Sequence, residues 1–190
     1  MNQDVFVVVE HLRGQVAEIS YVMLAAGRTL SQGIQGTLTA VLLGHNAQGL
    51  AEGMDADQVL YMDHPALAEF TSQAYQDALA ELIAGRQPRA VLVGHTTLGM
   101  DVAGGLSVRL GLPLVSACRT ITAQAGGSAK FTSQICGGKI MAEGELPGPT
   151  VLITVTPGGY KPEHGRSTST PPLTMVPAPA LESQRVVLKH

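Results

Sequence analysis

Short, unbroken apolar runs alternate with helical repeats along the first part of the chain. The run DVFVVV at residues 4–9 has no polar alternation, which is typical of a strand covered on both faces of a sheet. In the segment YVMLAAGRTLSQG that follows Ser20, apolar residues recur at helical spacing; Ser20 suits the N-cap and Gly33 the end. The same patterns predict strands at 36–43, 58–62 and 91–94, a short helix near residue 50, and the longest helix at 70–86. This alternation predicts βαβ units and a parallel sheet.

Residues 91–116, VLVGHTTLGMDVAGGLSVRLGLPLVS, combine a strand, a polar turn, a helix and a second strand. The helix is predicted from apolar residues spaced four apart: Val102, Leu106 and Leu110. Gly111 is expected to end it in the left-handed conformation. The following LPLVS is expected to be the next strand of the sheet.

Helical repeats stop after residue 116. Strands are predicted at 120–123, 130–136, 139–143 and 150–156, with a turn at residues 126–127, so this half of the sheet is expected to be partly antiparallel. The Pro-, Gly-, Ser- and Thr-rich stretch from 157 to 180 predicts an extended, weakly ordered arm, and residues 183–189 a last edge strand. We therefore expect one domain at 1–156 and an arm at 157–190.

Composition supports one domain of the α/β class. The chain has 190 residues, 45% hydrophobic but only 4% aromatic, and 22 glycines, which describes a core of small aliphatic residues and many close turns. Its net charge is −3, and Lys and Arg do not cluster. Nucleic acid is therefore not an expected partner.

Location and cysteine chemistry follow from what the sequence lacks. No apolar run reaches the ~18 residues of a membrane helix, and the first residues are predicted to form a strand rather than a signal peptide. We therefore expect a cytoplasmic protein with no membrane partner. Cys118 and Cys136 lie apart and are expected to be reduced thiols, buried or half-buried.

A ligand crevice is predicted at the carboxyl ends of the parallel strands, where connections diverge to opposite sides. Backbone N–H groups at the start of the helix, together with two Thr hydroxyls, would offer donors to a phosphate. The candidate cofactor-binding residues follow the first strand and the strand at 91–94; they are Glu10, His11, Gly94, His95, Thr96, Thr97, Gly99 and Asp101.

A structural interpretation of the same residues stands beside the ligand interpretation. The Thr hydroxyls would then satisfy the first-turn N–H groups of the helix itself, and Asp101 would be a first-turn charge on the helix dipole. An acidic side chain near the start of this helix makes the binding of an anionic ligand there less favourable. Glu10 and His11 also place a carboxylate, and no lysine or arginine, directly after the first strand, which disfavours a polyphosphate.

Known catalytic and phosphate motifs are absent from the sequence. Gly137-Gly138-Lys139 lacks the upstream glycine of a P-loop, and no Gly-x-Gly-x-x-Gly fingerprint or Gly-x-Ser-x-Gly elbow occurs. No catalytic or metal-ligating residue is assigned. Three histidines follow strands that should end on one edge and are the alternative candidates for a metal or phosphate site: His11, His45 and His95.

Three segments resemble the electron transfer flavoprotein alpha subunit. They are VVVEH at 7–11, the strand–loop–helix–strand at 91–116, and QICGGKIMAEGELPGPTVLITVTPGGY at 134–160. Each motif is soft by itself, but their order and spacing make the match specific from residue 1 to about 160. The resemblance implies a three-layer, adenine-nucleotide alpha-hydrolase-like α/β fold with a mostly parallel sheet.

The resemblance also implies a function. In that family the alpha subunit pairs with a beta subunit of related fold and carries electrons from flavoprotein dehydrogenases to an acceptor. The FAD isoalloxazine belongs to a second, C-terminal domain, and the beta subunit's crevice holds AMP or another FAD. The signatures of that C-terminal domain have no counterpart in these 190 residues. We therefore expect any FAD to be supplied by, or shared with, a partner domain.

Three hypotheses remain open from the sequence. The first is an alpha-subunit-like domain that docks an electron transfer flavoprotein beta-like subunit, a separate flavin domain or a second copy of itself; it predicts an exposed apolar patch on the helix-poor half or the arm. The second is a stand-alone module that binds AMP, ATP or FAD without catalysis. The third, a small-molecule hydrolase, rests only on fold analogy.

Overall fold

The computed structural model describes residues 2–124 and 128–181, so the turn predicted at 126–127 and the strand predicted at 183–189 lie outside it. The large sheet contains β1 (Val5–Val8), β4 (Leu38–Gly44), β5 (Gln58–Asp63), β6 (Ala90–Gly94), β7 (Leu114–Ala123), β8 (Ala129–Ile135), β9 (Ile140–Glu145), β10 (Val151–Val155) and β11 (Leu173–Met175). The α-helices are α1 (Glu18–Ile34), α2 (Ser72–Arg86) and α3 (Thr97–Leu110). Short elements are β2 (His11–Leu12), β3 (Gln15–Val16), η1 (Gln48–Ala51), η2 (Pro65–Leu67) and η3 (Pro162–Gly165).

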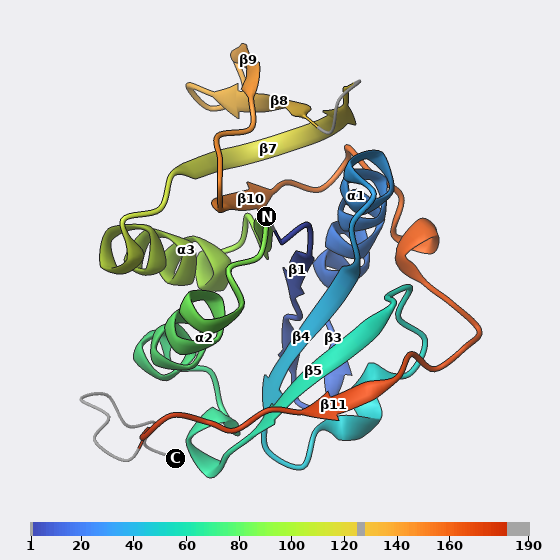
Figure 1. The fold of residues 1–190 in the computed structure, drawn as a ribbon, viewed down its shortest axis with the longest axis vertical. Helices are drawn as coiled ribbons and strands as arrows, with labels where there is room; N and C mark the ends of the chain where they lie inside the picture. The colour runs from blue at the N-terminus through green and yellow to red at the C-terminus, as the bar shows by residue number, and fades with distance from the viewer. Residues whose placement is uncertain (1, 125–127, 182–190) are drawn as a thin grey trace.

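The sheet has nine strands in the order β11-β5-β4-β1-β6-β10-β7-β8-β9 (Figure 1). Neighbouring strands are parallel from β11 to β7, whereas β7, β8 and β9 pair antiparallel. This confirms the expected α/β class with an antiparallel extension. After β1 the chain adds β4 on one side and later β6 on the other, so the sheet has a switch point between β1 and β6.

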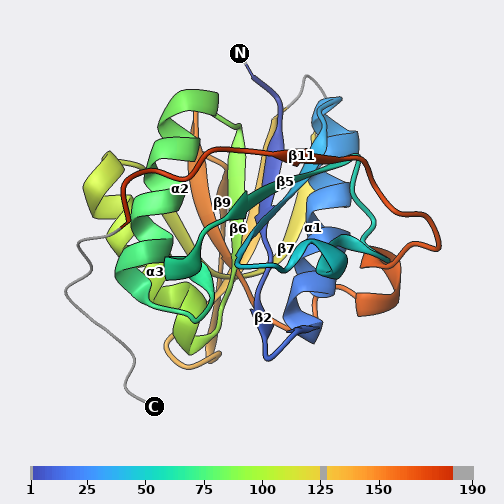
Figure 2. The same ribbon diagram turned by 90° about the horizontal axis from the view of Figure 1, so that it is seen from below.

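Helices cover both faces of the sheet, which gives the three layers. Helix α1 packs on one face, and α2 and α3 pack side by side on the other (Figure 2). Every residue of β1, β4, β6 and β10 is buried, as the unbroken apolar runs predicted. Val102 and Leu106 lie in the second core, and Gly111 ends α3 with φ of 63°.

Helix α1 begins earlier than predicted. Its N-cap is Ala17, which makes no side-chain cap bond, and Ser20 lies inside the first turn. The Ser20 hydroxyl instead accepts from the Glu10 N–H (2.8 Å) and donates to the Glu10 carbonyl (3.0 Å). The helix ends at Gln35, in the left-handed conformation, rather than at Gly33. The loop predicted after β1 also contains the small β2–β3 hairpin.

Strand β7 corrects the prediction of two separate strands at LPLVS and 120–123. It is one strand of ten residues, and it continues through an irregularity at Ala117, whose φ is 52°. A residue with positive φ between two apolar segments is typical of a break between two strands, but here it is an irregularity within one strand. The helix-poor half therefore remains part of the same sheet.

The arm at residues 157–180 is extended and makes specific contacts with the rest of the chain. The Tyr160 hydroxyl accepts from the Ile121 N–H (2.6 Å), and the Arg166 guanidinium lies 3.6 Å from the centroid of the Tyr21 ring. The arm then forms β11, which pairs with β5 at the edge of the sheet. One backbone hydrogen bond precedes β11, from the Val59 N–H to the Pro172 carbonyl, and one follows it, from the Val176 N–H to the Tyr61 carbonyl. These contacts could not be predicted from the Pro-rich composition, because they are made with residues far away in the sequence.

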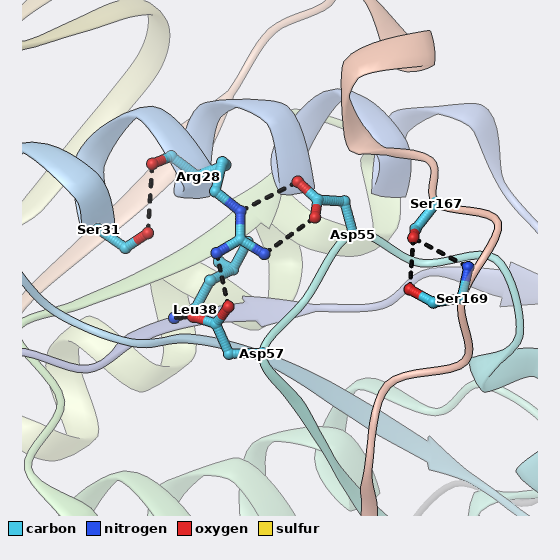
Figure 3. A network of polar contacts seen from close by, with 7 residues as sticks. All are labelled: Arg28, Ser31, Leu38, Asp55, Asp57, Ser167 and Ser169. Atoms are coloured by element: carbon cyan, nitrogen blue, oxygen red, sulfur yellow. Dashed lines mark hydrogen bonds and ion pairs between the residues drawn. The ribbon is translucent and has the colours of Figure 1, made fainter.

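An ion-pair network fixes the amino ends of β4 and β5 to α1 (Figure 3). Arg28 donates two hydrogen bonds to Asp55 (2.9 and 3.0 Å) and one to Asp57 (2.7 Å). Asp57 also accepts from the Leu38 N–H (2.8 Å). The network lies at the amino ends of the strands, whereas the predicted crevice lies at their carboxyl ends. We therefore assign it a role in the fold.

The two cysteines are free and differ in exposure. Cys118 is fully buried, and burial raises the pKa of its thiol to about 12. Cys136 is exposed at the turn between β8 and β9, which corrects the expectation that both are at least half-buried. No helix within residues 2–124 and 128–181 combines the length and apolar character needed to cross a membrane.

Candidate functional site

The predicted crevice lies at the switch point of the sheet, where Glu10 leaves β1 and Thr96 follows β6. Thr96 is the N-cap of α3, and its hydroxyl accepts from the Gly99 N–H (3.0 Å). The same hydroxyl is 2.9 and 3.1 Å from the two carboxylate oxygens of Glu10, to which it donates. The structure therefore brings together two of the candidate residues in one hydrogen-bonded chain that ends on the first turn of a helix.

Two glycines give the Glu10 carboxylate its space. A Cβ atom on Gly94 would lie 2.3 Å from Glu10 Oε1, and a Cβ on Gly99 would lie 3.0 Å from the same oxygen. Gly99 also passes close to the strand end, because its Cβ would lie 2.0 Å from the Gly94 carbonyl oxygen. The carboxylate thus lies in a cradle that any larger residue at 94 or 99 would fill.

Burial changes the chemistry of Glu10. Desolvation raises the pKa of this carboxyl above its ordinary value of 4.5, while the hydrogen bond from Thr96 acts in the opposite direction. Its backbone is held separately, by both bonds to Ser20 and by the N–H of Ala17, which donates to the Glu10 carbonyl (2.9 Å). The position of the backbone therefore does not depend on the side chain.

The three candidate histidines do not converge. His11 Nε2 donates to the Leu43 carbonyl (2.6 Å), and His45 Nδ1 donates to Asp63 (3.0 Å). His95 Nδ1 is hydrogen-bonded to the Thr154 hydroxyl (2.9 Å). In the described part of the chain, no three His, Cys, Asp or Glu side chains form a group that could hold a metal ion. Each of the three imidazole rings is therefore hydrogen-bonded to a residue of a neighbouring strand.

The outer candidate residues lie away from the cradle. Asp101 lies beyond the first turn of α3 and is exposed, so it is not the first-turn charge that the structural interpretation expected. Its carbonyl accepts from the Gln76 side chain of α2 (3.1 Å). Thr97, the first residue of the helix, is also exposed. The helix cap is thus made by Thr96, as the structural interpretation proposed for the Thr pair.

A larger cavity of about 460 Å³ lies beside the cradle, at the carboxyl ends of β1, β4 and β5. Sequence reasoning considered His11 and His45 but missed its other principal lining residues, Arg13, Asn46, Glu69 and Phe70. Arg13 and Asn46 have positive φ values of 51° and 53°, typical of tight turns. Their place directly after strands was the available signal, since such loops meet at one rim.

Comparison with known proteins gives a consistent result. The family model described as "Electron transfer flavoprotein domain" matches residues 5–181. The electron transfer flavoprotein subunit alpha of Bacillus subtilis (strain 168) is 31% identical over 164 residues, which is 85% of this chain and 50% of that protein. Protein FixB of Bradyrhizobium diazoefficiens is 29% identical over 99% of this chain and 49% of its own length.

A further relative is named for an electron-transfer role in a larger assembly. The acryloyl-CoA reductase electron transfer subunit beta of Anaerotignum propionicum is 29% identical over 119 residues, or 61% of this chain and 32% of that protein. The chain spans about half the length of the first relatives it matches. The similarity therefore covers nearly all of this chain, but only a part of each relative.

Proposed function

This chain belongs to the electron transfer flavoprotein family, and from that membership we propose that it acts as an alpha-subunit-like domain in electron transfer. The observation that carries the proposal is the family match across 5–181, together with relatives named as the alpha subunit. In this proposal the chain is a partner subunit rather than a catalyst. It docks an electron transfer flavoprotein beta-like subunit or a separate flavin domain in the cytoplasm.

The proposal assigns FAD to the partner or to a domain shared with it. The cradle at the switch point supports this, because the Glu10 carboxylate already lies in the space between Gly94, Thr96 and Gly99. A carboxylate held there would repel a nucleotide phosphate. The candidate residues around it then serve the local structure of α3 and β6.

Exposed apolar side chains lie where a partner subunit was expected. Ile135 and Ile140 are direct partners across the β8–β9 pair and are 42% and 51% exposed; Met141 beside them is 47% exposed. We call these three residues the apolar hairpin end. Leu173 and Met175 of β11 are exposed on the opposite edge of the sheet (Figure 1). Apolar side chains of this size on a sheet edge are typical of association surfaces.

Stand-alone nucleotide binding is the second candidate function. The cavity of about 460 Å³ beside His11 and Arg13 is the observation in its favour, since it is open at the rim where α/β folds bind ligands. The family relationship does not favour it, and Glu10 opposes a phosphate at the start of α3. Calorimetric titration with AMP, ATP and FAD separates the two functions, because only this one predicts heat without a partner.

Co-purification tests the leading proposal. The tagged chain is expressed with an electron transfer flavoprotein beta-like subunit from the same genome, and the eluate is analysed by size-exclusion chromatography with light scattering. We expect a complex of the two chains. Ile140→Asp should weaken it at least tenfold because a charge must be desolvated at the interface. The control Val108→Asp, the same kind of apolar-to-charged change at an exposed position of α3, should leave it intact. A chain that elutes alone in every case contradicts the proposal.

A further inference from the structure

The Glu10 carboxylate occupies a position that has the features of an anion site. It lies between the ends of β1 and β6, accepts from the N-cap hydroxyl of α3, and is flanked by Gly94 and Gly99. Helix starts that follow a parallel strand are common phosphate sites in other α/β proteins because N–H groups and the helix dipole favour negative charge. Here the negative group is part of the chain itself.

We propose that Glu10 is a built-in anion that closes the crevice at the β1–β6 switch point, and that removing its carboxylate opens a site for the phosphate of a mononucleotide. The inference goes beyond the partner role proposed above. It assigns to one side chain the exclusion of nucleotide from this domain.

The backbone contacts of Glu10 argue against a purely structural role for its side chain. Both the N–H and the carbonyl of Glu10 are bonded to Ser20, and the carbonyl also accepts from Ala17. The cap on α3 is likewise made by Thr96, whose hydroxyl accepts from Gly99 without help from Glu10. Both backbone segments therefore keep their bonds when the carboxylate is removed.

Two cavities lie next to the Glu10 side chain and to His11, the residue that follows it. A small, mostly apolar cavity of about 20 Å³ lies against Glu10 and Gly99, and the larger cavity of about 460 Å³ begins on the other side of His11 and Phe70. Both cavities share His11 and Phe70 in their linings. Phe70 offers an aromatic ring and Arg13 a cation at the rim of the larger cavity, which suits a base and an anionic ligand.

Removal of the carboxylate is the direct test. Wild type and Glu10→Ala are titrated by calorimetry with AMP and, separately, with inorganic phosphate. We expect no measurable heat for wild type, and for Glu10→Ala an affinity for AMP at least about tenfold higher than wild type, because an unfavourable charge is replaced by open space with donors. Glu18→Ala, which removes a carboxylate from an exposed position in the first turn of α1, is the control and should gain nothing.

Two further variants identify the mechanism of any gain. Glu10→Gln removes the charge but keeps the volume of the side chain, so it should gain less affinity for AMP than Glu10→Ala does. Thr96→Val in the Glu10→Ala background removes the hydroxyl of the cradle and should abolish the gained affinity. If phosphate alone also binds to Glu10→Ala, the cradle recognises the phosphate group; if only AMP binds, the base in the larger cavity is required as well.

Thermal melts keep the test decisive if Glu10→Ala is destabilised. AMP at high concentration should then raise its melting temperature, since a ligand that binds only the folded state stabilises it. Folded Glu10→Ala that binds neither AMP nor phosphate overturns the inference. Failure of Glu10→Ala to fold even with AMP overturns it too, because the carboxylate would then be required by the fold. Neither result affects the partner role, which depends on co-purification at the apolar hairpin end.

Discussion

At the scale of the residue, two glycines of α3 differ in the space around them, so that alanine should have opposite effects on stability at the two positions. A Cβ on Gly99 would lie 2.0 Å from the Gly94 carbonyl and 2.9 Å from a Val93 methyl, whereas a Cβ on Gly104 meets nothing within 4 Å. We expect Gly99→Ala to destabilise the protein by about 1–3 kcal/mol, or more, through overpacking. Gly104→Ala should stabilise it by about 0.5–1 kcal/mol through helix propensity.

Urea unfolding of both glycine variants, with the free energy of unfolding extrapolated to water, checks this pair. The two substitutions are chemically identical and lie in the same helix, so any general effect of alanine cancels between them. Equal stability of Gly99→Ala and Gly104→Ala would contradict the close approach of α3 to the end of β6.

The pH dependence of stability follows from the raised pKa of Glu10. The folded state binds its proton more tightly than the unfolded chain, so this group's contribution to stability is fully present below its ordinary pKa of 4.5. The contribution is lost as the pH rises through the pKa of the folded state. We therefore expect the free energy of unfolding of wild type, minus that of Glu10→Gln, to decrease from pH 4 toward neutral pH.

Denaturant unfolding over a pH series measures this difference. Glu18→Gln, the same substitution at an exposed position of α1, is measured in parallel as the matched control. A difference between wild type and Glu10→Gln that stays flat, or that grows with pH, would mean that the carboxylate is not desolvated in its cradle.

Individual residues of the site were predictable only in part. Glu10, Gly94, Thr96 and Gly99 were foreseen at one crevice because each lies at the carboxyl end of a strand or the start of a helix. Their hydrogen bonds were not foreseen, since a carboxylate and a hydroxyl in such loops could face solvent or each other. His45 and Asn46 both bind Asp63 at the end of β5, and this partner is fixed by the register of β5 on β4 rather than by spacing in sequence.

At the scale of the element, strong periodicity predicted well and tertiary contacts decided the rest. Strands β1, β4, β5 and β6 were foreseen from apolar runs, and α3 from its spacing and its terminal glycine. The start of α1 was missed because Ser20 bonds across to Glu10 instead of capping its own helix. The single long β7 and the packed arm were missed because strand pairing and the Tyr160 contact involve distant residues.

The Arg28 network should contribute more than an exposed ion pair elsewhere in the protein. Arg28 makes a two-pronged contact with Asp55 and a third bond to Asp57, which a lysine cannot reproduce (Figure 3). We expect Arg28→Lys to lower the free energy of unfolding by about 1–2 kcal/mol. Arg109→Lys, which changes the pair with Asp77 between α2 and α3, should cost less than about 0.5 kcal/mol.

Salt provides the second readout for this comparison. Both ion pairs weaken at high ionic strength, but the half-buried Arg28 network should weaken less than the more exposed Arg109 pair. Equal losses of stability for the two lysine variants in chemical denaturation would show that the network in Figure 3 does not fasten α1 to the amino ends of β4 and β5.

At the scale of the whole molecule, the class of fold and the family could be foreseen from sequence. Order and spacing of soft motifs across 1–160 were sufficient, because a parallel sheet imposes similar loop positions on all its relatives. The exposed apolar side chains of β8 and β9 could be expected only as a consequence of partner binding. Their position at one edge of the sheet required the register of β9 on β8.

The most direct test of the partner role is the absorbance spectrum of residues 1–190, purified alone and passed through a desalting column. We place the flavin in another chain or domain, with Glu10 closing the crevice of this one. We therefore predict a protein with no flavin absorbance band. A flavin band that remains with this chain after desalting would contradict the account.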